Sequence, residues 1–95
     1  MPNNSSEVFT IGTNQTITVG AASAALGTAF GAYTTVARLV STTACHIAYG
    51  ATPTATTSNA YLPANTPWFI EVAPGMKVAA IQNAAGGTLH VTEMI

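Results

Sequence analysis

Apolar and polar residues alternate along most of this chain, in short segments that turn-forming residues separate. In residues 44–50, for example, Cys45 and Ile47 alternate with His46 and Ala48. Successive side chains of a strand point to opposite faces, so this period of two predicts half-buried β-strands and no long helix. The predicted strands lie at residues 7–11, 15–19, 35–41, 44–50, 61–62, 68–73, 76–82 and 88–94.

The turn residues between these segments predict how the strands connect. Residues 12–14 predict a hairpin between the first two strands, and residues 41–43 predict the strongest hairpin of the chain, between the two strands that flank them. Pro74 presets φ and Gly75 accepts a positive φ, so this pair predicts a further turn. Residues 20–32 are rich in Gly and Ala, and this composition leaves open a loop, a short strand near its end or a single helical turn.

Seven to eight short strands, with turns about every ten residues, predict an all-β fold that is either a small antiparallel β-sandwich or a jelly roll. A chain of 95 residues is expected to form a single domain, here residues 1–95 with a flexible arm at 1–6. In this fold Leu89 and Val91 face the core, and Ile17 and Val19 share one face of their strand.

The composition limits what this domain can bind. Ala contributes 18 residues and Thr 16, whereas Lys, Arg, Asp and Glu together make up 5% of the chain. Two cations, Arg38 and Lys77, are too few to neutralise a run of phosphates, so we expect no direct nucleic-acid binding. The absence of Asp excludes a calcium loop built from alternating Asp ligands. Because Ala buries little apolar surface, we expect a thin core that subunit contacts stabilise further.

Residues 8–37 form the one segment that invites a membrane interpretation, because they carry no charge and include Gly27 and Gly31 in a GxxxG spacing. A membrane-spanning helix needs about twenty mostly apolar residues, and Asn14, Gln15 and many Thr interrupt this segment. We expect no membrane association, with a small membrane-active protein such as a holin as a third alternative. The N-terminus lacks the features of a secretory signal, and one cysteine allows no internal disulfide, so we expect synthesis in the cytoplasm.

No group of side chains predicts catalysis or metal binding. Cys45 and His46 are adjacent in a predicted strand, so their side chains point to opposite faces and cannot form a nucleophile–base pair. A pair of Cys45 and His90 would depend on an unknown register. These three residues are also the only good ligands for a soft or borderline metal, and their spacing does not match a closed zinc site. The sequence predicts no catalytic, cofactor or metal site within one chain; a symmetric histidine cluster at an oligomer axis stays open.

The few charged residues predict surface or interface roles. Glu7, Glu71 and Glu93 lie on different predicted strands without a motif for paired carboxylates, so we expect solvated or ion-paired groups. Arg38 is in the middle of a strand, where a lone cation needs a partner or an interface. Its candidate partners are Glu71, Glu93 and a carboxylate of another subunit.

Aromatic residues near the proline turns are the other candidate contacts. Trp68 shares a predicted strand face with Ile70 and is assigned to the core. Tyr61 and Phe69 are assigned, together with Arg38, to an interface, because aromatic and Arg side chains are enriched at the centres of protein interfaces.

Several stretches between about residue 17 and the C-terminus carry a resemblance to a known family. They are residues 36–50 (VARLVSTTACHIAYG), 53–56 (PTAT), 61–67 (YLPANTP), 74–82 (PGMKVAAIQ) and 87–94 (GTLHVTEM), preceded by a Ser/Ala-rich segment at 23–31. These stretches resemble short tailed-bacteriophage proteins of about this length. The resemblance implies a phage structural module, in which small β-sandwich proteins often serve as capsid cement or decoration proteins.

We therefore expect a non-enzymatic structural protein of a phage virion, a cement or decoration protein on the capsid exterior that is assembled in the host cytoplasm. Its expected partners are the major capsid protein and further copies of itself, as a dimer or trimer, and it needs no cofactor. A surface of Thr, Ser, Asn and Gln forms hydrogen-bonded contacts without desolvating ions, which suits an assembly. The alternative is a carbohydrate- or receptor-binding module of a head fibre or tail, with Tyr49, Tyr61 and Trp68 as stacking platforms.

Overall fold

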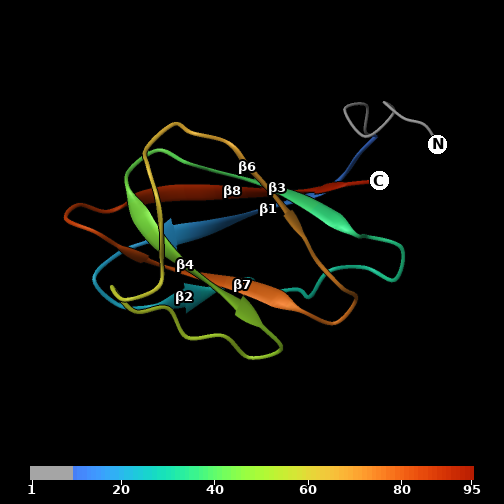
Figure 1. Ribbon diagram of the computed structural model, residues 1–95, viewed down its shortest axis with the longest axis horizontal. Helices are drawn as coiled ribbons and strands as arrows, with labels where there is room; N and C mark the ends of the chain where they lie inside the picture. Colours follow the sequence, from blue (N-terminus) through green and yellow to red (C-terminus); the bar gives the residue numbers. More distant parts are fainter. Residues whose placement is uncertain (1–9) are drawn as a thin grey trace.

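The computed structural model describes residues 10–95, which fold into eight strands and contain no helix (Figure 1). The strands are β1 (Ile11–Val19), β2 (Ala24–Ala25), β3 (Val36–Ser41), β4 (Cys45–Gly50), β5 (Ala60–Leu62), β6 (Trp68–Glu71), β7 (Lys77–Gln82) and β8 (Gly87–Met94). They form two antiparallel sheets with the orders β1-β8-β3-β6 and β2-β7-β4-β5, which confirms the predicted all-β sandwich. The arm expected at 1–6, and most of the strand expected at 7–11, lie outside the described residues.

The strand pairing is nested, so that the first half of the chain pairs with the second half in reverse order. β1 pairs with β8, β2 with β7, β3 with β6 and β4 with β5. Further pairing of β3 with β8 and of β4 with β7 joins these pairs into the two sheets. The chain is thus one long antiparallel hairpin, folded back between β4 and β5 and rolled into two layers, which is the topology of a jelly roll.

The hairpin predicted across residues 41–43 is wrong, because β3 and β4 belong to different sheets. The connection between them turns over at one end of the sandwich and passes from one layer to the other (Figure 1). Two backbone hydrogen bonds hold it, from Thr42 N to Thr88 O and from Asn83 N to Ala44 O. It passes so close to Gly87 that a Cβ there would lie 2.5 Å from a Thr42 hydroxyl oxygen. A glycine is therefore required where β8 begins.

The hairpin predicted across residues 12–14 is also wrong, because β1 runs through this segment. The register of β1 against β8 changes from Ile11↔Met94 to Asn14↔Thr92, which inserts one extra residue on β1. Such an insertion is a β-bulge, which bends a strand without ending it. The Gly-Thr-Asn sequence that predicted a turn here is equally compatible with a bulge.

Residues 20–32 form a short strand with loops on both sides. β2 pairs with β7 through Ala24 and Ala25 only. Beyond it, Leu26 N donates to Val78 O and Phe30 N donates to Met76 O, so the chain follows β7 without regular strand geometry. This arrangement places the Leu26 and Phe30 side chains in the core.

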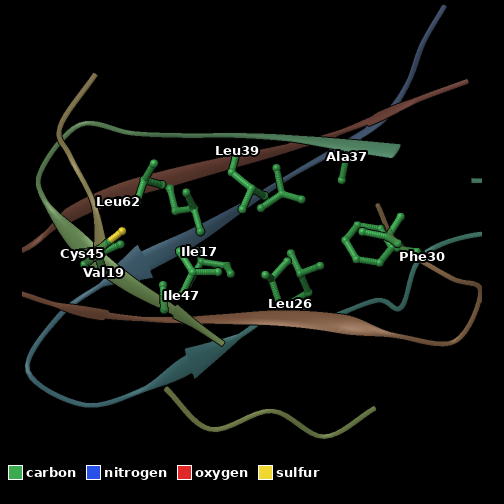
Figure 2. Close-up of a cluster of buried hydrophobic side chains, with 14 residues drawn as sticks. Ile17, Val19, Leu26, Phe30, Ala37, Leu39, Cys45, Ile47 and Leu62 are labelled. Carbon is green, nitrogen blue, oxygen red and sulfur yellow. The ribbon is translucent and has the colours of Figure 1, made fainter. Parts of the chain in front are cut away.

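The core fills the space between the two sheets, as Figure 2 shows. Ile17, Leu39 and Leu89 point inward from the first sheet and Ile47 from the second, in the alternation that the sequence predicts. Phe30 lies at one end of the cluster (Figure 2). The buried set is Ile17, Val19, Leu26, Phe30, Ala37, Leu39, Cys45, Ile47, Leu62, Val72, Val78, Ala80, Leu89 and Val91.

The turn predicted at Pro74 and Gly75 is confirmed. Met76 N donates to Ala73 O, and Gly75 has a φ of 84°, a value that suits the third residue of a type II turn. The turn links β6 to β7, so it too carries the chain from one sheet to the other.

Candidate functional site

Alternation along the strands leaves each sheet with an outward face, and the two outward faces differ. On the sheet β1-β8-β3-β6, residues that pair directly across strands share a face, so the cross-strand register assigns every outward side chain. We call this surface the Arg38 face. It consists of Val36, Arg38 and Val40 of β3, Thr88, His90, Thr92 and Met94 of β8, Ile11, Asn14, Thr16 and Thr18 of β1, and Phe69 and Glu71 of β6.

Arg38 lies near the centre of this face, with β8 on one side and β6 on the other. It pairs in register with Thr92 and with Phe69. Thr92 Oγ1 donates to Asn14 Oδ1 at 2.7 Å, which continues the polar row onto β1. Among the described residues, no carboxylate lies within 4.0 Å of the guanidinium, so the structure shows no intramolecular ion pair for this cation.

The sequence suggested two partners for Arg38 within the chain, Glu71 and Glu93, and the strand register distinguishes them. Glu93 lies on the opposite side of the sheet, because it is adjacent to Thr92, the outward partner of Arg38. A pair of Arg38 with Glu93 is therefore excluded by the pleat. Glu71 is exposed on the same face as Arg38, two pairs further along the β3–β6 ladder.

The rest of the Arg38 face is a mixture of apolar and small polar side chains. Phe69 is directly opposite Arg38 and is 54% exposed. Val36, Val40 and Met94 are half-buried around it. Arg and aromatic side chains are enriched at the centres of protein interfaces, so this composition is typical of a contact surface.

The outward face of the other sheet is partly covered by the chain itself. Ala25, Ala79 and Ala48 form one row across β2, β7 and β4, and we call this row the alanine face. The loop at 51–59 runs over it, on the side away from the other sheet (Figure 1). Ala55 of this loop is buried, its N–H donates to Ser23 Oγ at 2.8 Å, and Ala79 beneath is 0% exposed. Larger side chains in this row would hold the loop off the sheet.

His46 fixes the end of that loop. It points outward from β4 yet is only 7% exposed. Its Nδ1 lies 3.0 Å from Asn59 O, and its Nε2 lies 3.0 Å from Asn83 Oδ1. The ring also meets the edge of Tyr61 at a centroid distance of 5.5 Å. His46 thus connects the loop to the turn before β8, which gives it a structural role.

The three residues predicted to form an interface are not all brought together. Arg38 and Phe69 are direct neighbours on the Arg38 face. Tyr61 belongs to β5 in the other sheet and is half-exposed beside His46. Interface roles for Arg38 and Phe69 are compatible with one surface, and Tyr61 would need a second one.

The aromatic residues considered for carbohydrate stacking also lie apart. Trp68 points inward from β6 and packs against the core, as predicted. The Tyr49 hydroxyl accepts a hydrogen bond of 2.8 Å from Ala73 N at one end of the sandwich. Because Tyr61 lies on β5, the three rings do not share a surface.

Cys45 and His90, considered as a possible nucleophile and base, also lie apart. Cys45 is buried in the core, where burial raises the pKa of its thiol and a hydrogen bond with the Ser41 side chain opposes part of that rise. His90 lies on the Arg38 face, paired with Thr16 and Val40. A raised pKa keeps the thiol neutral and unreactive near pH 7. Within residues 10–95, no three His, Cys, Asp or Glu side chains are grouped as metal ligands.

The expectation that Glu93 is a solvated or ion-paired surface group is wrong. It is 6% exposed, and the Thr34 hydroxyl donates a hydrogen bond to its Oε1. The signal was present in the sequence, because Glu93 shares the inward phase of β8 with Leu89 and Val91. Glu71 is exposed as expected, and Glu7 lies outside the described residues.

Comparison with protein-family models, with curated proteins and with solved structures finds no match to this chain. Among the residues that the structure describes, no helix is long and apolar enough to cross a membrane.

Proposed function

We propose that this protein is a non-enzymatic structural component of a bacteriophage virion, a cement or decoration protein that binds the major capsid protein on the capsid exterior. One observation carries the proposal: the chain covers the alanine face of one sheet with its own loop and leaves the other sheet, around Arg38, with a cation that has no ion-pair partner among the described residues. The resemblance of the sequence to short tailed-phage proteins supports the same role. So does the jelly-roll topology, by analogy, because viral capsid domains often use it.

The mechanism is mechanical. A cement protein adds buried area across a joint between capsid subunits and so opposes the pressure of the packaged DNA. The Arg38 face suits this task, because it has few ions to desolvate and its Thr and Asn side chains can form hydrogen bonds with a neighbour. An Arg at the centre of such a contact typically contributes more than rim residues do.

The test is the composition and stability of purified virions. We expect this protein at a fixed copy number in the hundreds, and we expect Arg38→Ala to weaken its retention on heated particles more than Lys77→Ala does. Lys77 is the matched control, because it is the other cation of the chain and lies on β7 in the opposite sheet. Equal loss of both variants, or absence of the protein from virions, would contradict the proposal. Binding to glycans with a change in Trp68 fluorescence would favour the carbohydrate-binding alternative.

A further inference from the structure

We propose that two copies of this chain form a symmetric dimer through the Arg38 face, with Arg38 of each copy paired to Glu71 of the other. This inference names the self-association surface of the proposed virion protein. It is tested on the purified protein without any capsid, so its failure and the failure of the virion role can be told apart.

The argument begins with the distribution of charge. Of the described charged residues, Glu93 is buried inside the sandwich and Lys77 lies on β7 of the other sheet. The Arg38 face therefore holds one fixed positive group and one fixed negative group, Arg38 and Glu71, with the titratable His90 further along β8. Within residues 10–95, neither Arg38 nor Glu71 has an oppositely charged group within 4.0 Å. A surface with equal and opposite charges is complementary to a second copy of itself.

The register gives the positions of these two groups. Val36 pairs with Glu71, and Arg38 pairs with Phe69, so the four side chains stand at the corners of a small rectangle on the β3–β6 ladder. Arg38 and Glu71 occupy one diagonal, with their Cα atoms about 7 to 8 Å apart. Val36 and Phe69 occupy the other diagonal.

A two-fold axis that lies in the plane of the face and runs along the second diagonal places Arg38 over Glu71 of the second copy. The same operation places Glu71 over the second Arg38, so both charges are paired twice in one contact. Phe69 and Val36 lie near the axis, and each meets its own counterpart. Because both charges belong to one patch, a closed pair of this kind is isologous, whereas a trimer would need two separate patches. The strands of the two copies cross steeply, as in orthogonal sheet packing.

The second copy is a better occupant for this face than an acidic or basic partner. An acidic partner would pair with Arg38 and repel Glu71, and a basic partner would do the reverse. The aromatic and aliphatic side chains around the charges would lie at the centre of the contact, where water is excluded and charge pairs gain most.

The test is a charge-reversal series followed by sedimentation velocity across the micromolar range. We expect the unmodified protein to dimerise, and we expect Arg38→Glu and Glu71→Arg each to raise the dimer dissociation constant about a hundredfold, since each converts two attractive pairs into two repulsive pairs. The double variant restores the dimer. A mixture of the two single variants also restores it, as a heterodimer in which every charge has an opposite partner. Lys77→Glu is the matched control and leaves the dimer unchanged.

A second measurement checks the position of the axis. We expect Val36→Cys to form a cross-link between copies with a short bis-maleimide, because a residue near the two-fold axis meets its own counterpart across the spacing of about 10 Å between facing sheets, which is too wide for a direct disulfide. Thr18→Cys, at the far end of the same face, forms none. A monomeric or trimeric protein, a dimer that resists both single reversals, or a mixture of single variants that stays monomeric would each overturn the proposal. A pair formed only within one chain would leave the oligomeric state unchanged in every variant.

Discussion

The two outward faces of this jelly roll come from the same alternating pattern, but one is partly covered by the chain and the other is exposed to solvent. The alanine face is covered by the loop at 51–59 and contributes to the stability of one subunit. The Arg38 face presents Phe69 and Glu71 to solvent, and we expect it to contribute less to that stability. Alternation therefore tells which residues point outward, and the small size of the outward alanines allows the loop at 51–59 to cover them.

The covering loop follows from the topology. β4 and β5 are the only consecutive strands that lie in the same sheet, so their connection is the only one that does not have to cross between layers at an end of the sandwich. It is free to lie across the sheet, and the alanine face allows the backbone to approach. Ser23 and His46 then hold it at two points.

The largest expected effect is on the free energy of unfolding, when a larger side chain is placed on one face or the other. Ala79→Leu should lower the free energy of unfolding by about 3 kcal/mol, because the added carbons have no space beneath the loop. Thr18→Leu makes a change of similar kind on the exposed edge of the Arg38 face and should cost less than about 0.5 kcal/mol. Chemical denaturation of both variants measures the difference. Equal effects would mean that the loop does not press on the sheet.

A smaller effect is expected for the two histidines. His46→Leu should cost about 2 kcal/mol, since it removes two hydrogen bonds of a buried side chain. His90→Leu, on the half-buried Arg38 face, should stay within about 0.5 kcal/mol. Hydrogen exchange of the loop amides adds a local readout, and faster exchange is expected only in the His46 variant. Unchanged exchange in that variant would show that His46 does not hold the loop.

Ser23 tests the second attachment of the loop. Ser23→Ala leaves the buried Ala55 N–H without its acceptor and should cost about 1 kcal/mol. Ser58→Ala, in the exposed part of the same loop, is the matched control and should have no measurable effect. Limited proteolysis within 51–59 should accelerate in the first variant alone. Similar cleavage rates in both variants would argue against this attachment.

The smallest effect is expected for Arg38 in the isolated subunit. Arg38→Ala should change the unfolding free energy by less than about 0.5 kcal/mol at protein concentrations where the chain is monomeric, because the structure shows no ion pair for it among the described residues. Its effect should emerge only when the subunits associate. If Arg38→Ala lowered the free energy of unfolding of the dilute monomer by several kcal/mol, Arg38 would stabilise the single subunit. The two faces would then not differ in the way described.

The sequence predicts strand positions and faces well, and strand partners poorly. Leu89 and Val91 point inward as expected, because alternation records the face of each residue. The two predicted hairpins do not form, because alternation carries no information on which strand is the neighbour. The same turn residues serve a hairpin, a bulge such as that at 12–14, or a crossing between layers.

In the candidate site too, the faces of residues were predictable from the sequence and their neighbours were not. The outward position of Arg38 beside Phe69 follows from alternation once the pairing of β3 with β6 is known. The burial of His46 and Ala79 could not be predicted, because both point outward and are covered only by a loop that is distant in sequence. Glu93 was predictable from its inward phase, and its polar character alone argued against burial. The interface roles of Arg38, Tyr61 and Phe69 stay predictions.

The nested pairing of the strands also sets the order in which this fold can assemble. Among the described residues, β1 pairs only with β8, so it stays without a strand partner until β8 has been synthesised. Contacts between such distant segments make folding slow, and an unpaired strand of nine residues is open to wrong pairing meanwhile. The innermost pair, β4 with β5, can close first. A ribosome-bound chain that lacks β8 should therefore be a ready substrate for chaperones, whereas the complete chain should release them.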